Sequence, residues 1–87
     1  MDKQLVKIIV PYIWTRFKIY LNDPSYFVRG TDVLASVFGK GEVGVKQFIK
    51  DINHKLTTLA GDSKKPKKVK YKSNMTYHDV LTNFVKL

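Results

Sequence analysis

The chain has 87 residues, no cysteine and a formal net charge of +9. This length suits one domain, so we expect residues 1–87 to fold as a single unit. Hydrophobic residues make up 44% of the sequence, which favours a packed core over general disorder. The missing cysteines exclude disulfide bonds, thiol nucleophiles and cysteine-based zinc sites. The excess of positive charge indicates an anionic partner, either nucleic acid or anionic lipid.

Apolar residues at spacings of three and four predict an amphipathic helix in the first part of the chain. They are Leu5, Ile8, Ile9, Tyr12, Ile13, Phe17, Tyr20 and Leu21. Pro11 lacks a backbone donor, so we expect either a kink or a second helix with Pro11 in its first turn. A strand stays open for residues 12–21, because they are rich in residue types of high β-propensity.

The longest apolar run, residues 8–14, is too short to cross a membrane, which takes ~20 residues. Lys7 interrupts the apolar stretch that a signal peptide would need. We therefore expect no integral membrane association. We also expect an intracellular protein, nuclear or cytoplasmic rather than secreted.

Turn signals and short elements follow the first helix. Residues 22–25 read NDPS and predict a turn. Residues 26–30, YFVRG, read as a short strand. A helix over residues 32–38 comes next, and Thr31 or Asp32 is placed to cap it.

Residues 39–44, GKGEVG, match the phosphate-binding pattern G-x-G-x-x-G and open a helix. The motif needs a buried strand before it and a full βαβ unit around it, which a chain of this length cannot supply. A kinase-type loop also needs valine where this chain has Lys46. We therefore interpret the stretch as a loop between helices, in which Gly44 is placed to bind one DNA phosphate.

The strongest helical pattern spans residues 45–60 and ends at Gly61. Its apolar stripe consists of Val45, Phe48, Ile49, Ile52, Leu56 and Leu59. Its polar side carries Lys46, Gln47, Lys50, Asn53 and His54. These residue types suit a DNA groove, because Lys donates to guanine or phosphate while Gln and Asn pair with adenine. An ordinary solvated helix face is the alternative interpretation.

Residues 63–73, SKKPKKVKYKS, carry six lysines and no acid. Charged and apolar residues alternate over residues 68–72, KVKYK, with the period of a half-buried strand. Tyr71 has two interpretations: an exposed ring that stacks on a base, or a buried residue of the strand. After this segment, Thr76 and Asp79 form a capping-box pattern that predicts a final helix.

The predicted order is helix, short strand, helix, helix, strand, helix. This order predicts an α+β, helix-rich fold, namely a winged-helix-like helix-turn-helix domain. In such a domain residues 45–60 enter the groove and residues 64–72 hold phosphates as the wing. The nucleic-acid-binding residues that we predict are Lys40, Lys46, Gln47, Lys50, Asn53, His54, Lys64, Lys65, Lys67, Lys68, Lys70, Tyr71 and Lys72.

No pattern indicates catalysis, a metal site or a cofactor. The seven acidic residues contain no pair marked as an acid/base couple, and the four serines lack a nucleophile signature. His54 and His78 lie on different predicted elements without a third ligand at metal spacing. We therefore expect a protein that is not an enzyme.

Residues 26–41, YFVRGTDVLASVFGKG, resemble the N-terminal DNA-binding domain of BRO proteins, which occur in large DNA viruses and phages. The residues that match in kind are Tyr26, Phe27, Val28, Asp32, Val33 and Gly39, within a resemblance over about residues 17–55. The chain departs from the family at Lys40, where Tyr usually follows the glycine, and in its first helix, where the family usually has strands. The resemblance implies DNA binding in a viral or mobile-element setting.

We therefore expect a small basic nucleic-acid-binding protein, with DNA favoured over RNA as the partner and a role in transcription regulation. Two alternatives stay open. The first is a protein-interaction or scaffold module that forms oligomers, such as a homodimer, through its first and last helices. The second is a peripheral binder of anionic membranes.

Overall fold

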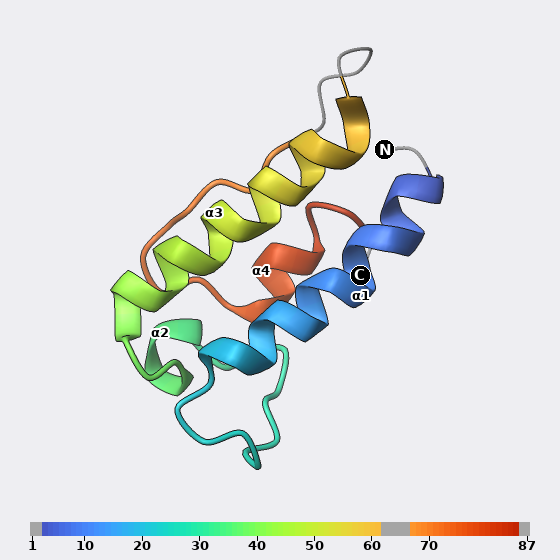
Figure 1. Ribbon diagram of the computed structural model, residues 1–87. Helices are drawn as coiled ribbons and strands as arrows, with labels where there is room; N and C mark the ends of the chain where they lie inside the picture. Colours follow the sequence, from blue (N-terminus) through green and yellow to red (C-terminus); the bar gives the residue numbers. More distant parts are fainter. Residues whose placement is uncertain (1–2, 62–66, 86–87) are drawn as a thin grey trace.

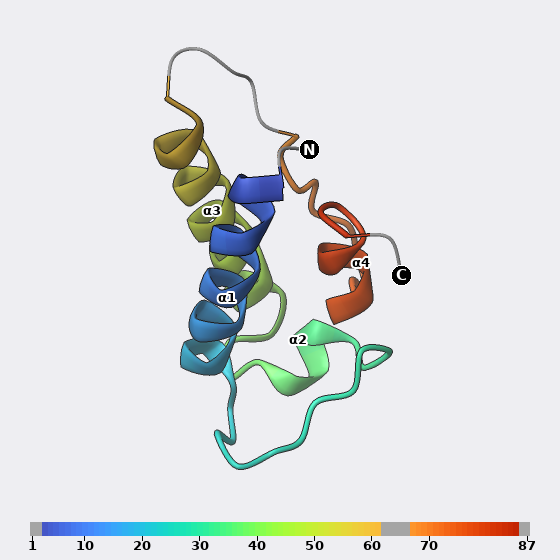
Figure 2. The ribbon, with the colours of Figure 1, turned by 90° about the vertical axis from the view of Figure 1, so that its right-hand side faces the viewer.

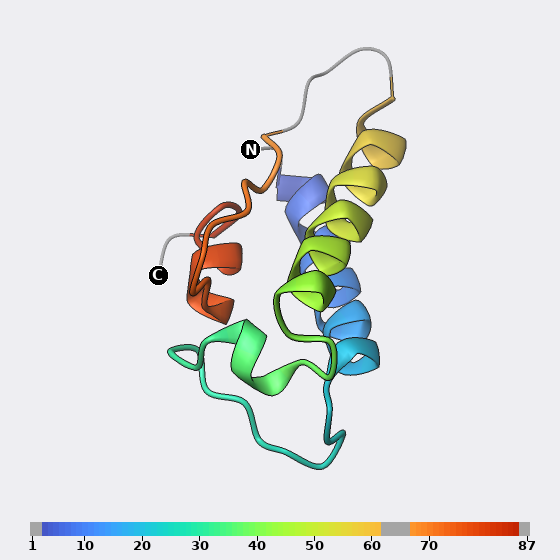
Figure 3. The ribbon, with the colours of Figure 1, turned by 90° about the vertical axis from the view of Figure 1, so that its left-hand side faces the viewer.

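A computed structural model describes residues 3–61 and 67–85. Within these ranges the chain forms α1 (Lys3–Tyr20), α2 (Leu34–Val37), α3 (Gly41–Ala60) and α4 (Tyr77–Leu81). α1 and α3 run side by side in opposite directions (Figure 1), and α2 and α4 lie against one side of this pair (Figures 2 and 3). The loop between α1 and α2 projects from the end of the pair where α1 stops and α3 starts.

α1 is one helix that continues through Pro11, so the predicted helix is confirmed. The alternative of a second helix with Pro11 in its first turn and the strand alternative for residues 12–21 are both wrong. Pro11 lies on the solvent side of α1. The backbone bond that proline deletes is the one to the carbonyl of Lys7, which is also exposed, so water can take its place. The core-facing side of α1 consists of Ile9, Ile13 and Phe17, all fully buried.

α3 supplies the largest share of the core. Its buried apolar side consists of Val45, Phe48, Ile49, Ile52 and Leu56, as the apolar stripe predicted. Phe17 and Phe38 pack edge-on against Phe48 with ring centroids 6.0 and 5.4 Å away. Gly61 ends the helix with a left-handed φ of 64°, which confirms the predicted stop. The C-terminal part of the chain also contributes to the core, with Val69, Met75, Val80 and Phe84.

The predicted α+β, winged-helix-like helix-turn-helix fold is wrong, because the described residues form helices and no sheet. Two isolated antiparallel bridges, Leu21 with Phe38 and Val33 with Thr76, are the β-type pairings among them. A strand needs a neighbouring strand for its backbone groups. Each of the two predicted strands instead has backbone groups bonded to loop, helix or side-chain partners.

Residues 26–30, the first of these predicted strands, form part of an exposed loop. The backbone N–H of Arg29 donates to the Asp32 carboxylate at 2.9 Å, and the carbonyl of Gly30 accepts from the backbone N–H of His78 at 3.0 Å. Phe27 is 84% exposed, so the apolar residues of this stretch do not share a buried face. The high β-propensity of the stretch is therefore overridden by local turn bonds.

The helix expected over residues 32–38 is reduced to α2, which has Val33 at its N-cap and no side-chain cap bond. The predicted cap by Thr31 or Asp32 is therefore wrong. The break expected at residues 39–44 is also shorter, because α3 begins at Gly41 and only residues 38–40 separate the two helices. Gly44 is buried within α3, so GKGEVG does not form an open phosphate-binding loop.

α4 begins with the predicted capping box. The Thr76 hydroxyl accepts from the Asp79 backbone N–H, and the Asp79 carboxylate accepts from the Thr76 backbone N–H. Tyr77 then packs its ring edge-on against Phe17, with centroids 4.8 Å apart. Across the described ranges, no helix has both the length and the apolar content that a membrane span requires.

Candidate functional site

The outer side of α3 carries the residues predicted to contact nucleic acid. Lys46, Lys50 and His54 are exposed there. Gln47 is exposed as well, but its amide donates to the Asp51 carboxylate at 3.0 Å. Gln47 is therefore bonded within its own helix, although it lies on the same exposed face as Lys46, Lys50 and His54.

Asp51 anchors α3 to α1. Its carboxylate accepts from Arg16 Nη2 at 2.8 Å and from the Tyr20 hydroxyl, in addition to Gln47. Partial burial on its own would raise the pKa of Asp51, but the hydrogen bonds from Tyr20, Arg16 and Gln47 outweigh it and lower the pKa. Asp51 is therefore ionised at neutral pH, and its charge is compensated by Arg16.

Asn53 has a structural task that the sequence pattern did not predict. Its side-chain amide donates to the Val69 carbonyl at 2.9 Å, and its side-chain carbonyl accepts from the Val69 backbone N–H at 2.8 Å. Val69 itself is buried in the core. Asn53 thus provides for Val69 the paired bonds that a neighbouring strand would supply, and it holds the extended residues 67–72 along α3 (Figure 1).

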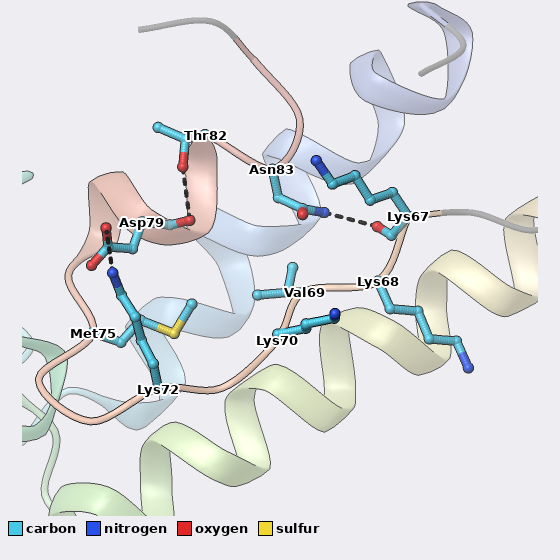
Figure 4. A pocket seen from close by; sticks show the side chains of 9 residues that line it. All are labelled: Lys67, Lys68, Val69, Lys70, Lys72, Met75, Asp79, Thr82 and Asn83. Atoms are coloured by element: carbon cyan, nitrogen blue, oxygen red, sulfur yellow. Dashed lines mark hydrogen bonds and ion pairs between the residues drawn. The ribbon is translucent and has the colours of Figure 1, made fainter.

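A second asparagine holds the start of the same segment. Asn83, which follows α4, donates from its side-chain amide to the Lys67 carbonyl at 2.8 Å (Figure 4). These bonds explain why residues 67–72 stay extended without forming a strand. The predicted alternation is nevertheless correct in part, since Val69 is buried and Tyr71 half-buried while Lys68, Lys70 and Lys72 are exposed.

Tyr71 is half-buried, so it is neither the fully exposed ring nor the buried residue that the two interpretations predicted. Its ring packs on the edge of the core, and the Lys46 ammonium lies 5.3 Å from the ring centroid. This cation–π contact joins the segment to the N-terminal half of α3. Because the Asn53 bonds join Val69 to a later turn of α3, the segment runs back along the helix towards its N-terminal end.

The result is one surface that we call the lysine surface, made by Lys46, Lys50, Lys67, Lys68, Lys70 and Lys72, all exposed. Among the described residues, Lys72 is the member that pairs with a carboxylate, at 3.3 Å from Asp79. A hydrogen bond from the Thr76 backbone N–H, helped by Lys72, lowers the pKa of Asp79 and keeps it ionised. The other five lysines leave the surface strongly positive.

The remaining predicted site residues lie as follows. Lys40 is exposed at the N-cap of α3, and Lys64 and Lys65 lie outside the described residues. Asn83, Asp51 and the pairing of Asp79 with Lys72 were missed, although the capping role of Asp79 was predicted. The bonds of Asn83 to Lys67 and of Asp51 to Arg16 and Tyr20 join residues 16 to 35 positions apart, so no local pattern signals them. Within the described ranges, no three His, Cys, Asp or Glu side chains gather as a metal site.

Comparison with known proteins finds no matching family model, no similar curated protein and no similar solved structure. The resemblance of residues 17–55 to the BRO N-terminal domain therefore stays a prediction from the sequence.

Proposed function

We propose that this protein binds nucleic acid, with DNA favoured over RNA, through the lysine surface. The observation that carries the proposal is the pair of hydrogen bonds from Asn53 to Val69. These bonds bring the lysines of residues 67–72 beside Lys46 and Lys50 of α3 in one exposed, positively charged surface. Such a surface attracts the phosphate backbone of a nucleic acid by Coulomb forces and counterion release.

The two parts of the surface would have different tasks. The extended segment offers Lys67, Lys68 and Lys70 to phosphates, where they act as point charges that carry no sequence information. Lys50 lies on the outward side of a regular helix, and that helix has the shape that the major groove of B-DNA admits. The deep and narrow major groove of an RNA duplex does not admit a helix, which favours DNA.

A shift assay with duplex DNA, single-stranded DNA and RNA at several salt concentrations tests the proposal. If the five lysines that have no carboxylate partner within the described ranges each neutralise a phosphate, log K on duplex DNA falls with log[salt] at a slope of about −4 to −5. Absence of binding to all three probes at low salt would show that the proposal is wrong. Binding with a much smaller slope would mean that the lysine surface is not the interface.

Matched variants locate the interface on the protein. The double variant Lys68→Ala/Lys70→Ala should weaken binding to all sequences alike and reduce the salt slope by about 2. Lys50→Ala should change the preference among duplex sequences as well. The control is Lys7→Ala/Lys18→Ala, which removes the same charge from the exposed side of α1. An equal loss in this control would attribute binding to net charge alone.

A second candidate function is protein interaction, and exposed apolar side chains favour it. Phe27 is 84% exposed at the loop between α1 and α2, and Ile19 is 61% exposed on α1. Light scattering over a range of concentrations tests this candidate. A stable oligomer that Phe27→Ser or Ile19→Ser dissociates, together with no salt-sensitive binding to nucleic acid, would favour it over DNA binding.

A further inference from the structure

A pocket of about 650 Å³ lies between residues 67–72 and α4 (Figure 4). Lys67, Lys68, Lys70 and Lys72 line it, together with Met75 and Asp79. Its two sides are held together, because Asn83 donates to the Lys67 carbonyl at 2.8 Å and Lys72 pairs with Asp79 at 3.3 Å. The volume is in the range of sites that bind small molecules.

The charge balance of this pocket favours an anion. Asp79 is the acid in its lining, and both of its carboxylate oxygens have partners. One oxygen accepts from the Thr76 backbone N–H at 2.9 Å, and the other pairs with Lys72. Lys67, Lys68 and Lys70 are exposed and have no carboxylate partner among the described residues. Lys68 is directed away from α4 and out over α3 (Figure 4), so the ammonium groups of Lys67 and Lys70 are the ones available to a ligand in the pocket.

We propose that this pocket binds a compact polyphosphate, meaning a small ring that carries phosphate groups on several of its carbons. Lysine ammonium groups bind phosphate as point charges. An extended chain advances ~3.3 Å per residue, so Lys67 and Lys70 are separated by about 10 Å along the backbone, and each can bind a different phosphate of one ring. The aliphatic stems of the lysines provide apolar surface for the ring itself.

This site is independent of the nucleic-acid proposal, although the two share lysines. Lys67 lines the pocket and Lys50 does not, since Lys50 lies on the outer side of α3. Lys67→Ala and Lys50→Ala therefore distinguish ligand binding in the pocket from nucleic-acid binding on α3. The ligand chemistry has two natural sources, a soluble inositol polyphosphate and the headgroup of a phosphoinositide lipid, and the experiment distinguishes them.

Titration calorimetry of the full chain with inositol hexakisphosphate tests the proposal. We expect saturable binding of one ligand per chain, weakened about three- to fivefold by Lys67→Ala, the loss expected for one exposed charge contact. Lys50→Ala should stay within twofold of the parent protein, and Lys67→Arg should restore most of the affinity. Circular dichroism checks that each variant is folded, which the exposure of both lysines leads us to expect.

Co-sedimentation with vesicles supplies the second measurement. Sedimentation with vesicles that contain phosphatidylinositol 4,5-bisphosphate, but not with phosphatidylserine vesicles of equal charge, would assign the lipid headgroup. Binding of inositol hexakisphosphate without either vesicle would assign the soluble ligand. Equal weakening by Lys50→Ala and Lys67→Ala, or no saturable binding, would overturn the proposal. Binding through Lys67 without any shift of DNA or RNA would retain it and reject the nucleic-acid function instead.

Discussion

Asn53 is the residue on which the position of the lysine-rich segment depends most directly. It bonds both backbone groups of Val69 from a helix 16 residues earlier in the chain. Truncating it leaves a buried N–H and a buried C=O at Val69 without their partners, which costs more than the loss of an exposed hydrogen bond. The effect of this truncation on nucleic-acid binding would therefore be indirect, since Asn53 adds no charge to the lysine surface.

We predict that Asn53→Ala lowers the free energy of unfolding by about 1–3 kcal/mol, measured by urea denaturation. Hydrogen exchange at the Val69 amide should become faster. The substitution should also weaken nucleic-acid binding, although no lysine is changed. Asn22→Ala is the matched control, because Asn22 is exposed in the loop after α1. An unchanged exchange rate at Val69 would show that Asn53 does not hold the segment.

At the scale of the elements, the two ends of α3 depend on glycines with positive φ. Gly41 begins the helix at φ 56°, and Gly61 ends it at φ 64° and ψ −159°. The start at Gly41 was not predicted, because the first turn contains two glycines, which are poor helix formers. Burial of Gly44 and Val45 against Phe38 and the core stabilises this turn in the folded protein.

We predict that Gly61→Ala lowers the free energy of unfolding by about 1–3 kcal/mol, because its backbone conformation is essentially restricted to glycine. For a domain of this size the thermal midpoint falls by roughly 4–8 °C per kcal/mol, which circular dichroism measures. Gly39→Ala is the control: its φ is not positive, and an added Cβ would meet Asn22 at an ordinary 3.6 Å. Equal effects of the two substitutions would contradict the argument from φ.

For the molecule as a whole, periodicity was sufficient to predict the two long helices and most of their buried faces, although Ile8 of the predicted face of α1 is exposed. Local chemistry was sufficient for the stop at Gly61 and for the Thr76 capping box. The sheet was predicted wrongly because an alternating pattern reports which side chains are buried and not what bonds the backbone. At residues 67–72 the backbone partners are asparagine side chains distant in sequence, which no local window contains.

The candidate site was predicted to a similar extent. The pattern located its lysines, because charge and exposure follow from residue type and helical face. It assigned Asn53 to base contact, while the amide of Asn53 is bonded to Val69 in the fold. The sequence does not tell whether an asparagine side chain is exposed or hydrogen-bonded to the backbone, so only the tertiary arrangement distinguishes the two cases.

The stability of the whole molecule should depend on pH through groups that join its elements. Asp51 and Asp79 have a folded-state pKa below the usual 3.8. A lowered pKa gives stability that is present above the unfolded-state value and is lost as pH falls through the folded-state value. Tyr20 has the opposite sign: burial and its bond to Asp51 raise its pKa above the usual 10.0. Its stabilisation is present below pH 10 and is lost as pH rises further.

We therefore predict a plateau of thermal stability between about pH 5 and 9, with a fall below about pH 4 as the carboxylates protonate. Asp51→Asn should lower the midpoint at pH 7, because Arg16 loses its carboxylate, and should make the acid fall shallower. Asp23→Asn should leave most of the fall, since the Asp23 carboxylate accepts from Ser25 within one exposed turn and does not join two elements. An acid fall in Asp51→Asn as steep as in the parent protein would mean that the contact between α1 and α3 does not titrate with Asp51.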